Sequence, residues 1–119
     1  MIDHITVSVT DFDRSRTFYD LILAPLGIER LYADGDMAAG YGNDGKAFFW
    51  IAKIPNCATQ VHIVFTAPSH EAIIAFHRIA LGSGGADNGA PGFRPHYNDR
   101  YYAAFILDPD GNNIEAVIQ

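Results

Sequence analysis

The chain has 119 residues, of which 49% are hydrophobic and 18% are charged, a balance typical of one globular domain. Its formal net charge of −6 at pH 7 argues against nucleic acid or an anionic membrane as the main partner. A single cysteine, Cys57, excludes an internal disulfide, and no apolar stretch resembles a membrane span or a secretory leader, so we expect a cytoplasmic protein with one domain over residues 1–119.

Along the first half of the chain, hydrophobic residues recur every two residues in some segments, as in strands, and about every 3.6 residues in others, as in helices. Alternation predicts a strand over residues 2–10, and helical spacing predicts a helix over 12–24 with Asp11 as its N-cap. Three short strands separated by turn-forming residues follow, at about 28–33, 37–42 and 46–54. We expect these elements to form a first module over about residues 1–55.

The second half repeats this order. Residues 60–67 are typical of a strand, and Ser69 can cap a helix over 70–81. The glycine-rich segment 82–92 lacks a phosphate-binding pattern, and we expect a loop there. Two final strands are predicted at about 101–107 and 112–118, joined by a type I turn at Asp108-Pro109-Asp110-Gly111. The second module then covers about 59–119, and the order is βαβββ twice, an α+β fold.

Two histidines occupy the same place in the two modules. His4 and His62 each open a strand, and a pair of ring-bearing residues follows each of them fourteen residues later. Such a repeat indicates two similar modules that face each other. Alternation directs the aliphatic side chains toward the helices, so His4, His62 and Glu115 on the last strand should point to the opposite, concave side. Each alone would more often be an ordinary strand residue, but together they can form a metal site with open positions.

Three stretches of the sequence carry a family resemblance: DHITVSV from residue 3, VHIVF at 61–65 and DPDGNNIEAV at 108–117. They resemble the glyoxalase, bleomycin-resistance and extradiol-dioxygenase group, the vicinal oxygen chelate superfamily, over nearly the whole chain. The resemblance implies paired βαβββ modules whose curved mixed sheets surround a cavity, and it implies a homodimer. It also implies one divalent ion per chain (Zn, Ni, Fe or Mn) held at the matching positions His4, His62 and Glu115.

Within this group the sequence looks like a lactoylglutathione lyase with one departure. The fourth ligand of those lyases is a Glu or Gln on the fourth strand, and the matching position here holds Trp50, which cannot bind a metal. The resemblance thus implies a metal-dependent enzyme that acts on a small molecule with adjacent oxygens. Glu115 would move the proton, as the matching glutamate does in the lyases.

Three alternatives to a lyase stay open. Extradiol dioxygenases share the three ligands and add a histidine, matched by His96, and a tyrosine whose place holds Phe105. Fosfomycin-resistance thiol transferases share the ligands, a tryptophan and a threonine, matched by Trp50 and Thr6, but they need a cationic pocket. Non-catalytic drug-binding proteins of the bleomycin type have the same fold and generally lack the ligands.

The segment 94–102 is dense in polar and aromatic residues, so it could border the mouth of a cavity. The alternative is a loop tucked against the sheet or against a dimer partner, with its tyrosine rings buried. The residues expected to contact substrate are Thr6, Trp50, Tyr97, Tyr102 and Phe105, and the catalytic candidates are His96 and Glu115.

Overall fold

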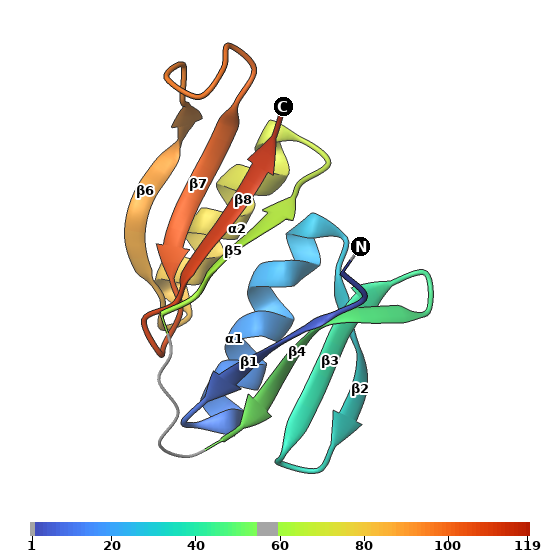
Figure 1. The fold of residues 1–119 in the computed structure, drawn as a ribbon. Coiled ribbons are helices and arrows are strands. Elements are labelled where there is room, and N and C mark those ends of the chain that lie inside the picture. The colour runs from blue at the N-terminus through green and yellow to red at the C-terminus, as the bar shows by residue number, and fades with distance from the viewer. Residues whose placement is uncertain (1, 55–59) are drawn as a thin grey trace.

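The computed structural model describes residues 2–54 and 60–119 and shows two βαβββ modules (Figure 1). The first holds β1 (Ile5–Val9), α1 (Phe12–Leu23), a short 3₁₀ helix η1 (Ala24–Leu26), β2 (Glu29–Asp34), β3 (Ala38–Asn43) and β4 (Lys46–Lys53). The second holds β5 (His62–Thr66), α2 (His70–Gly82), β6 (Ala86–Phe93), β7 (Tyr102–Leu107) and β8 (Asn113–Ile118). The predicted α+β fold is confirmed, whereas Cys57 and the boundary between the modules lie outside the described residues.

Each module forms a four-stranded mixed sheet, and the two sheets have the same topology. The strand order is β1-β4-β3-β2 in the first sheet and β5-β8-β7-β6 in the second. The first strand of each module pairs in parallel with its last strand, and the remaining pairs are antiparallel. The internal repeat seen in the sequence is therefore a repeat of structure.

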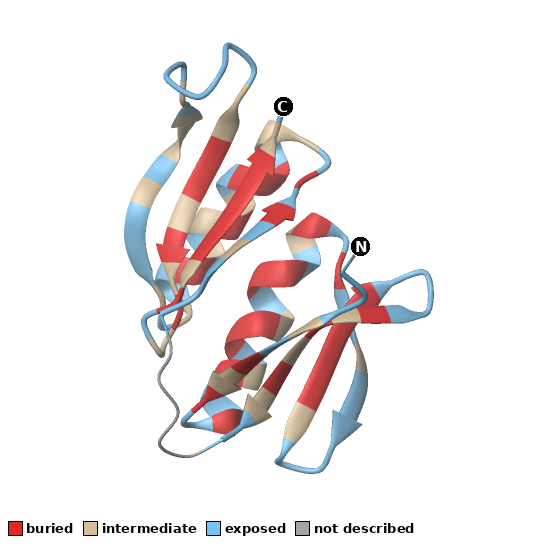
Figure 2. Cartoon of the chain, viewed as in Figure 1, coloured by how far each residue is buried: buried red, intermediate tan, exposed pale blue. Residues whose placement is uncertain are grey.

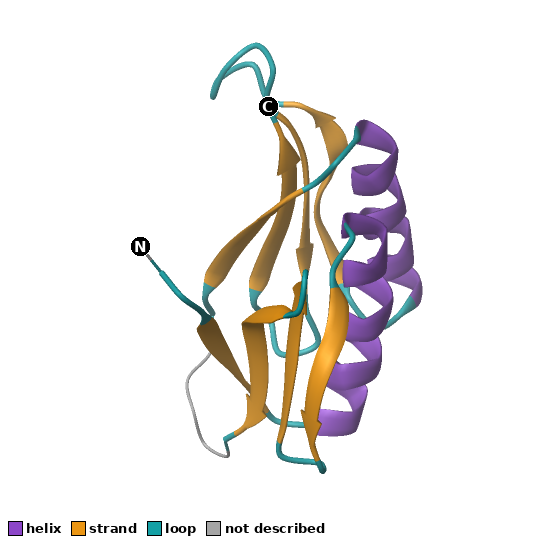
Figure 3. Cartoon of the chain, turned by 90° about the vertical axis from the view of Figure 1, so that its right-hand side faces the viewer, coloured by secondary structure: helices purple, strands orange, loops and turns teal. Residues whose placement is uncertain are grey.

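Both helices cover the same side of the strand layer (Figure 3). Each begins where the sequence predicts, because the side chains of Asp11 and Ser69 accept hydrogen bonds from backbone N–H groups of the first turn. The buried residues fall on both helices and on strands of both sheets (Figure 2), and they form one core across the two modules. Within residues 2–54 and 60–119 no helix covers the opposite side, which we call the open face. The two sheets lie side by side and do not close into a barrel. No helix in the described part of the chain is long and apolar enough to span a bilayer.

A buried polar cluster joins the two modules. The hydroxyl of Tyr19 on α1 donates to Asp108 Oδ2 (2.6 Å) in the turn between β7 and β8. Asp108 also accepts from Asn112, whose side-chain oxygen in turn accepts from the backbone N–H groups of Gln60 and Val61. Asp108 and Asn112 are both buried, so these hydrogen bonds provide partners for polar side-chain atoms that water cannot reach.

Two sequence predictions about strands need correction. The segment 82–92 was predicted to be a loop, yet Ala86–Phe93 forms strand β6 at the edge of the second sheet. Its sequence lacks apolar alternation, and pairing with β7 imposes the extended backbone, with register shifts near Gly89 and Gly92. The first strand is also shorter than the predicted 2–10, so His4 lies just before β1.

Candidate metal site on the open face

The open face of the second module brings His62 and Glu115 together. His62 is the first residue of β5, and Glu115 lies on β8, the strand that pairs with β5 in parallel. The distance from His62 Nε2 to Glu115 Oε2 is 3.2 Å. The Glu115 side chain is only 2% exposed, whereas that of His62 is 47% exposed. A carboxylate from the sheet interior thus meets an imidazole at the surface.

The second ring nitrogen of His62 shows how this pair can bind a cation. Nδ1 lies 3.3 Å from the backbone oxygen of Asn113, and because a carbonyl only accepts, Nδ1 carries the hydrogen. In the neutral ring, the lone pair of Nε2 then faces Glu115 Oε2. Two electron-rich atoms so close need a proton or a metal ion between them. Two ligand atoms bound about 2.0–2.1 Å from one ion lie roughly 2.9–3.4 Å apart, so the observed spacing suits a metal.

Tyr101 holds the other oxygen of the same carboxylate. Its hydroxyl donates to Glu115 Oε1 at a distance of 2.5 Å. Burial, together with the hydrogen bond to this carboxylate, raises the pKa of Tyr101 to about 12. Tyr101 therefore stays protonated and remains a donor at neutral pH. It belongs to the loop between β6 and β7, which adjoins the C-terminal end of β8, and its hydroxyl reaches Glu115 on that strand.

Phe105 and Arg94 form the apolar and cationic parts of the same surface. Phe105 on β7 is the pairing partner of Glu115, and its ring is nearly parallel to that of His62, with 6.3 Å between centroids. The Arg94 guanidinium lies 5.5 Å above the Phe105 ring. It donates to the backbone oxygens of Ala90 and Gly92, and it has no carboxylate partner among the described residues. A positive charge thus lies over the ring that neighbours both His62 and Glu115.

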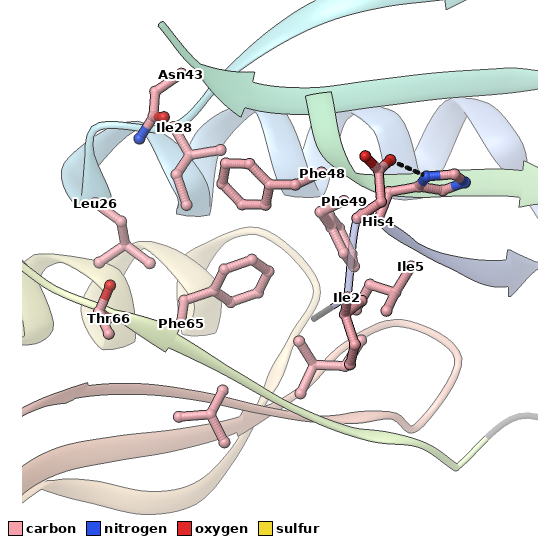
Figure 4. A pocket seen from close by; sticks show the side chains of 13 residues that line it. Ile2, His4, Ile5, Leu26, Ile28, Asn43, Phe48, Phe49, Phe65 and Thr66 are labelled. Carbon is pink, nitrogen blue, oxygen red and sulfur yellow. Dashed lines mark hydrogen bonds and ion pairs between the residues drawn. The ribbon is translucent and has the colours of Figure 1, made fainter. Parts of the chain in front are cut away.

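His4 has a similar arrangement in the first module. Its Nδ1 lies 2.7 Å from Asp3 Oδ1, and Lys46 binds the same carboxylate at 2.8 Å (Figure 4 shows His4 from close by). The hydrogen bond from Lys46, and then the one from His4, lower the pKa of Asp3, so the carboxylate is ionised and His4 donates through Nδ1. Nε2 is again left to bind a metal, and an oxygen partner on the other nitrogen is what metal-binding histidines usually have.

Trp50 lies in the same half of the molecule as His4. A hollow of about 350 Å³ is lined by both residues, and by Asp3, Tyr32, Gly45, Lys46 and Ala47. The indole ring covers Gly40 and stacks on Tyr32, with 5.8 Å between centroids. Thr6, the other predicted contact of the first module, is the pairing partner of Trp50 on the neighbouring strand β1. The predicted residues of the first module therefore gather around His4.

Within one chain the three predicted ligands do not meet. In residues 2–54 and 60–119, no three His, Cys, Asp or Glu side chains lie close enough together to hold one ion. His62 and Glu115 pair, while His4 remains on the first module. A mostly apolar groove of about 470 Å³ runs between the two modules, and its lining includes His4, Phe48, Ile63 and Phe65 (Figure 4). Each open face thus holds one part of the predicted ligand set.

The remaining predicted residues lie at different places. His96 and Tyr97 pack on each other in the β6–β7 loop, and Tyr97 also contacts the ring of Tyr101 (4.8 Å between centroids). Tyr102 stacks on His70 of α2 at 3.9 Å, on the helix side of the sheet. Neither Tyr101 nor Arg94 is among the individual site residues predicted from the sequence. The clustering of aromatic residues at 94–102 was the only signal that pointed to them.

Comparisons with known proteins agree with this fold. Residues 1–116 match the family model described as "Glyoxalase/Bleomycin resistance protein/Dioxygenase superfamily". A search of curated proteins found no match. A solved glyoxalase/bleomycin resistance protein from Albidiferax ferrireducens T118 is 32% identical, with a TM-score of 0.86 over 100% of this chain and 99% of that one.

Two more distant structures show the shared fold. A glyoxalase/bleomycin resistance protein/dioxygenase family enzyme from Burkholderia phytofirmans PsJN is 15% identical, with a TM-score of 0.71 over 97% of this chain and 95% of its own. A lactoylglutathione lyase from Agrobacterium tumefaciens is also 15% identical, with a TM-score of 0.68 over 98% and 92%.

Proposed function

Because the chain belongs to the glyoxalase, bleomycin resistance protein and dioxygenase superfamily, we propose that it is a metal-dependent enzyme acting on a small molecule with two adjacent oxygens. Its nominal activity is of the lactoylglutathione-lyase type. The observation that carries the proposal is the His62–Glu115 pair, whose 3.2 Å spacing and hydrogen-bonded Nδ1 suit a divalent ion such as Zn, Ni, Fe or Mn.

The complete site forms between two copies of the chain. His4 of one copy would join His62 and Glu115 of the other when the open face of one first module lies against the open face of the partner's second module. A two-fold homodimer would form two such sites. Support comes from the division of the ligands between the two open faces, and from the absence of any helix over those faces in the described part of the chain.

Each side chain has a defined role in this proposal. A bound divalent ion would act as a Lewis acid toward two neighbouring substrate oxygens. Glu115 would leave the ion, take a proton from the substrate carbon through Oε2 and return it to the adjacent carbon. Phe105 and Trp50 form apolar walls that exclude water, and Arg94 attracts a negatively charged substrate. The hemithioacetal of glutathione and methylglyoxal carries such charge.

Arg94 also favours a second candidate, a thiol transferase of the fosfomycin type. That branch needs a cationic group for its phosphonate substrate, and the guanidinium above Phe105, the ring that neighbours His62, supplies one. Thr6 and Trp50 match further positions of that branch and pair across β1 and β4. The assay should therefore include fosfomycin with a thiol as well as the hemithioacetal and catechols, each with nickel-, zinc- and iron(II)-loaded protein.

A subunit-mixing experiment tests the shared site. Neither His4→Ala nor His62→Ala homodimers should retain stoichiometric metal, because each lacks a ligand in both sites. Mixed dimers of the two variants regain one intact site. After random exchange, metal content should recover to about one quarter of the wild-type value, because half of the dimers are mixed and each holds one site.

Two outcomes would contradict the proposal in different ways. Wild-type protein that retains no divalent metal would refute the metal enzyme itself. Metal-loaded wild-type protein with no recovery after mixing would place the site within one chain. The His70→Ala variant is the matched control, because His70 stacks on Tyr102 at the helix side of the second sheet. Its metal content should equal that of the wild type.

A further inference from the structure

We propose that Tyr101 is the positioning residue of the metal site, and that it restricts Glu115 to binding the ion through one oxygen, Oε2. The inference rests on the function proposed above. It adds a residue that acts through Glu115, and it assigns the number of coordination positions that Glu115 occupies.

The two oxygens of Glu115 have different partners. Oε1 accepts the hydroxyl hydrogen of Tyr101 at 2.5 Å, and Oε2 faces His62 Nε2 at 3.2 Å. Because the Glu115 side chain is only 2% exposed, water cannot readily replace Tyr101 at Oε1. The carboxylate therefore cannot rotate to offer both oxygens to an ion beside His62 without losing this hydrogen bond.

Tyr101 is itself held in place by the loop that contains it. Its backbone oxygen accepts from the N–H of Arg94 (2.7 Å), and its own N–H donates to the oxygen of Asn98 (3.3 Å). Its ring packs against Tyr97 at 4.8 Å between centroids. These contacts fix the direction of the hydroxyl, so the β6–β7 loop orients a metal ligand that lies on another strand.

The single-oxygen arrangement matters for a chelating substrate. Two imidazoles and one carboxylate oxygen leave roughly three positions free on a six-coordinate ion, enough for two substrate oxygens and a water. If Glu115 bound through both oxygens, one of these positions would be lost. Tyr101 thus keeps room at the ion for two adjacent oxygens, which connects this hydrogen bond to the proposed class of substrate.

The test compares Tyr101→Phe with Tyr97→Phe in the full-length protein. Tyr101→Phe removes one hydroxyl and keeps the ring contact, so circular dichroism should show an intact fold. Cobalt(II) titration should show about 10- to 100-fold weaker binding, typical of losing a group that orients a ligand. The visible absorption spectrum of bound cobalt should also change in position or intensity, because the carboxylate coordinates differently. Tyr97→Phe should keep the wild-type affinity and spectrum.

The outcomes separate this inference from the proposed function. If wild-type protein binds cobalt and Tyr101→Phe binds it with equal affinity and an identical spectrum, Tyr101 has no positioning role and the metal site stands. If wild-type protein binds no cobalt, both the metal site and the role of Tyr101 are refuted. An equal loss of affinity in Tyr97→Phe would also overturn the inference, because the effect would then come from disturbing the loop.

Discussion

Glu115 is the residue on which the proposed chemistry depends, and burying its carboxylate lowers the stability of the folded chain. Its side chain is buried, and its neighbours along β8, Ile114 and Ala116, are completely buried in the core. A buried carboxylate loses the hydration of its charge, and only good hydrogen-bond partners offset that loss. Tyr101 and His62 are those partners. A buried carboxylate that carries this cost is a good candidate for a functional residue.

Replacing Glu115 with Gln should separate metal binding from folding. The amide oxygen can still accept a hydrogen bond from Tyr101. We therefore expect the free energy of unfolding of the metal-free variant to lie within about 1 kcal/mol of the wild-type value. Its metal affinity should fall at least about 100-fold, because the charged ligand is lost. Urea unfolding and cobalt titration measure the two quantities. Asp99→Asn, at an exposed position of the β6–β7 loop, is the control and should change neither. Wild-type affinity in the Gln variant would show that Glu115 is not a ligand.

The buried tyrosines predict a loss of stability in alkali. Burial, and then the neighbouring Asp108 charge, raise the pKa of Tyr19 well above its ordinary value of 10. Burial also raises the pKa of Tyr41, with a further contribution from Asp20. Above about pH 10 the unfolded chain releases protons that the native chain keeps, so stability should fall by about 1.4 kcal/mol per pH unit for each tyrosine.

Urea unfolding at a series of pH values from 8 to about 11 measures this loss. Stability should be constant with respect to these two groups below pH 10 and should decline above it. Tyr19→Phe should have a shallower decline because it lacks one of the titrating groups. Identical slopes for wild type and variant would mean that Tyr19 titrates normally in the folded chain.

At the scale of elements, the sequence predicted those strands and helices whose own residues show periodicity. Strand β4 was expected at 46–54 and covers Lys46–Lys53, and the helices begin at their predicted caps. Strand β6 was missed because Ala86–Phe93 has no apolar alternation and is held by β7. Tyr101 was missed because a loop has no alternation from which the direction of a side chain can be read. Its neighbour Tyr102, in contrast, points toward α2.

The division of the ligands could not be predicted for a related reason. Strand parity correctly groups Glu115 with His62 on one face, because parity depends on a single strand. The relative position of two sheets depends on how α1, α2 and the core pack together. The sequence therefore predicts which side of a sheet carries a candidate ligand, and it does not predict which candidate ligands meet.

Two glycines provide a test of strand geometry at this scale. A Cβ atom built on Gly42 in β3 would lie 1.8 Å from the backbone oxygen of Lys46, where the β3–β4 register shifts. Gly42→Ala should therefore lower the free energy of unfolding by more than about 2 kcal/mol. Gly82 at the end of α2 has open space, and Gly82→Ala should be neutral or stabilising by up to about 1 kcal/mol. Chemical denaturation measures the free energy of unfolding of both variants. Equal values for Gly42→Ala and Gly82→Ala would contradict the expected clash at Gly42.

At the scale of the whole molecule, two features determine whether the modules can move relative to each other. The core is continuous across both modules, and the Tyr19–Asp108 hydrogen bond joins α1 to the β7–β8 turn. The modules should therefore move together, and the open faces should keep their relative position. A site that needs both faces is then better completed by a second copy than by closure of one chain.

A pair of exposed apolar residues tests the predicted homodimer. Val64 lies on β5 and is 46% exposed, and its alternation along the strand places it on the open face with His62. Leu81 on α2 is 44% exposed. Sedimentation velocity at micromolar concentration should show a wild-type dimer. Val64→Asp should shift it toward monomer and lower its metal content, whereas Leu81→Asp should remain dimeric. A wild-type monomer under these conditions would refute the shared site.

The parallel pairing of β5 with β8 also has a consequence for the order of folding. Pairing of His62 with Asn113 and of Val64 with Glu115 closes a long loop that contains α2, β6 and β7. Such distant contacts form slowly because the entropy of the loop is lost before the contacts stabilise it. His62 and Glu115 therefore meet only after the rest of the module has collapsed. In a refolding experiment, the capacity to capture metal should therefore appear no earlier than the slowest folding phase of the chain, because dimers can complete the site only after His62 and Glu115 have met.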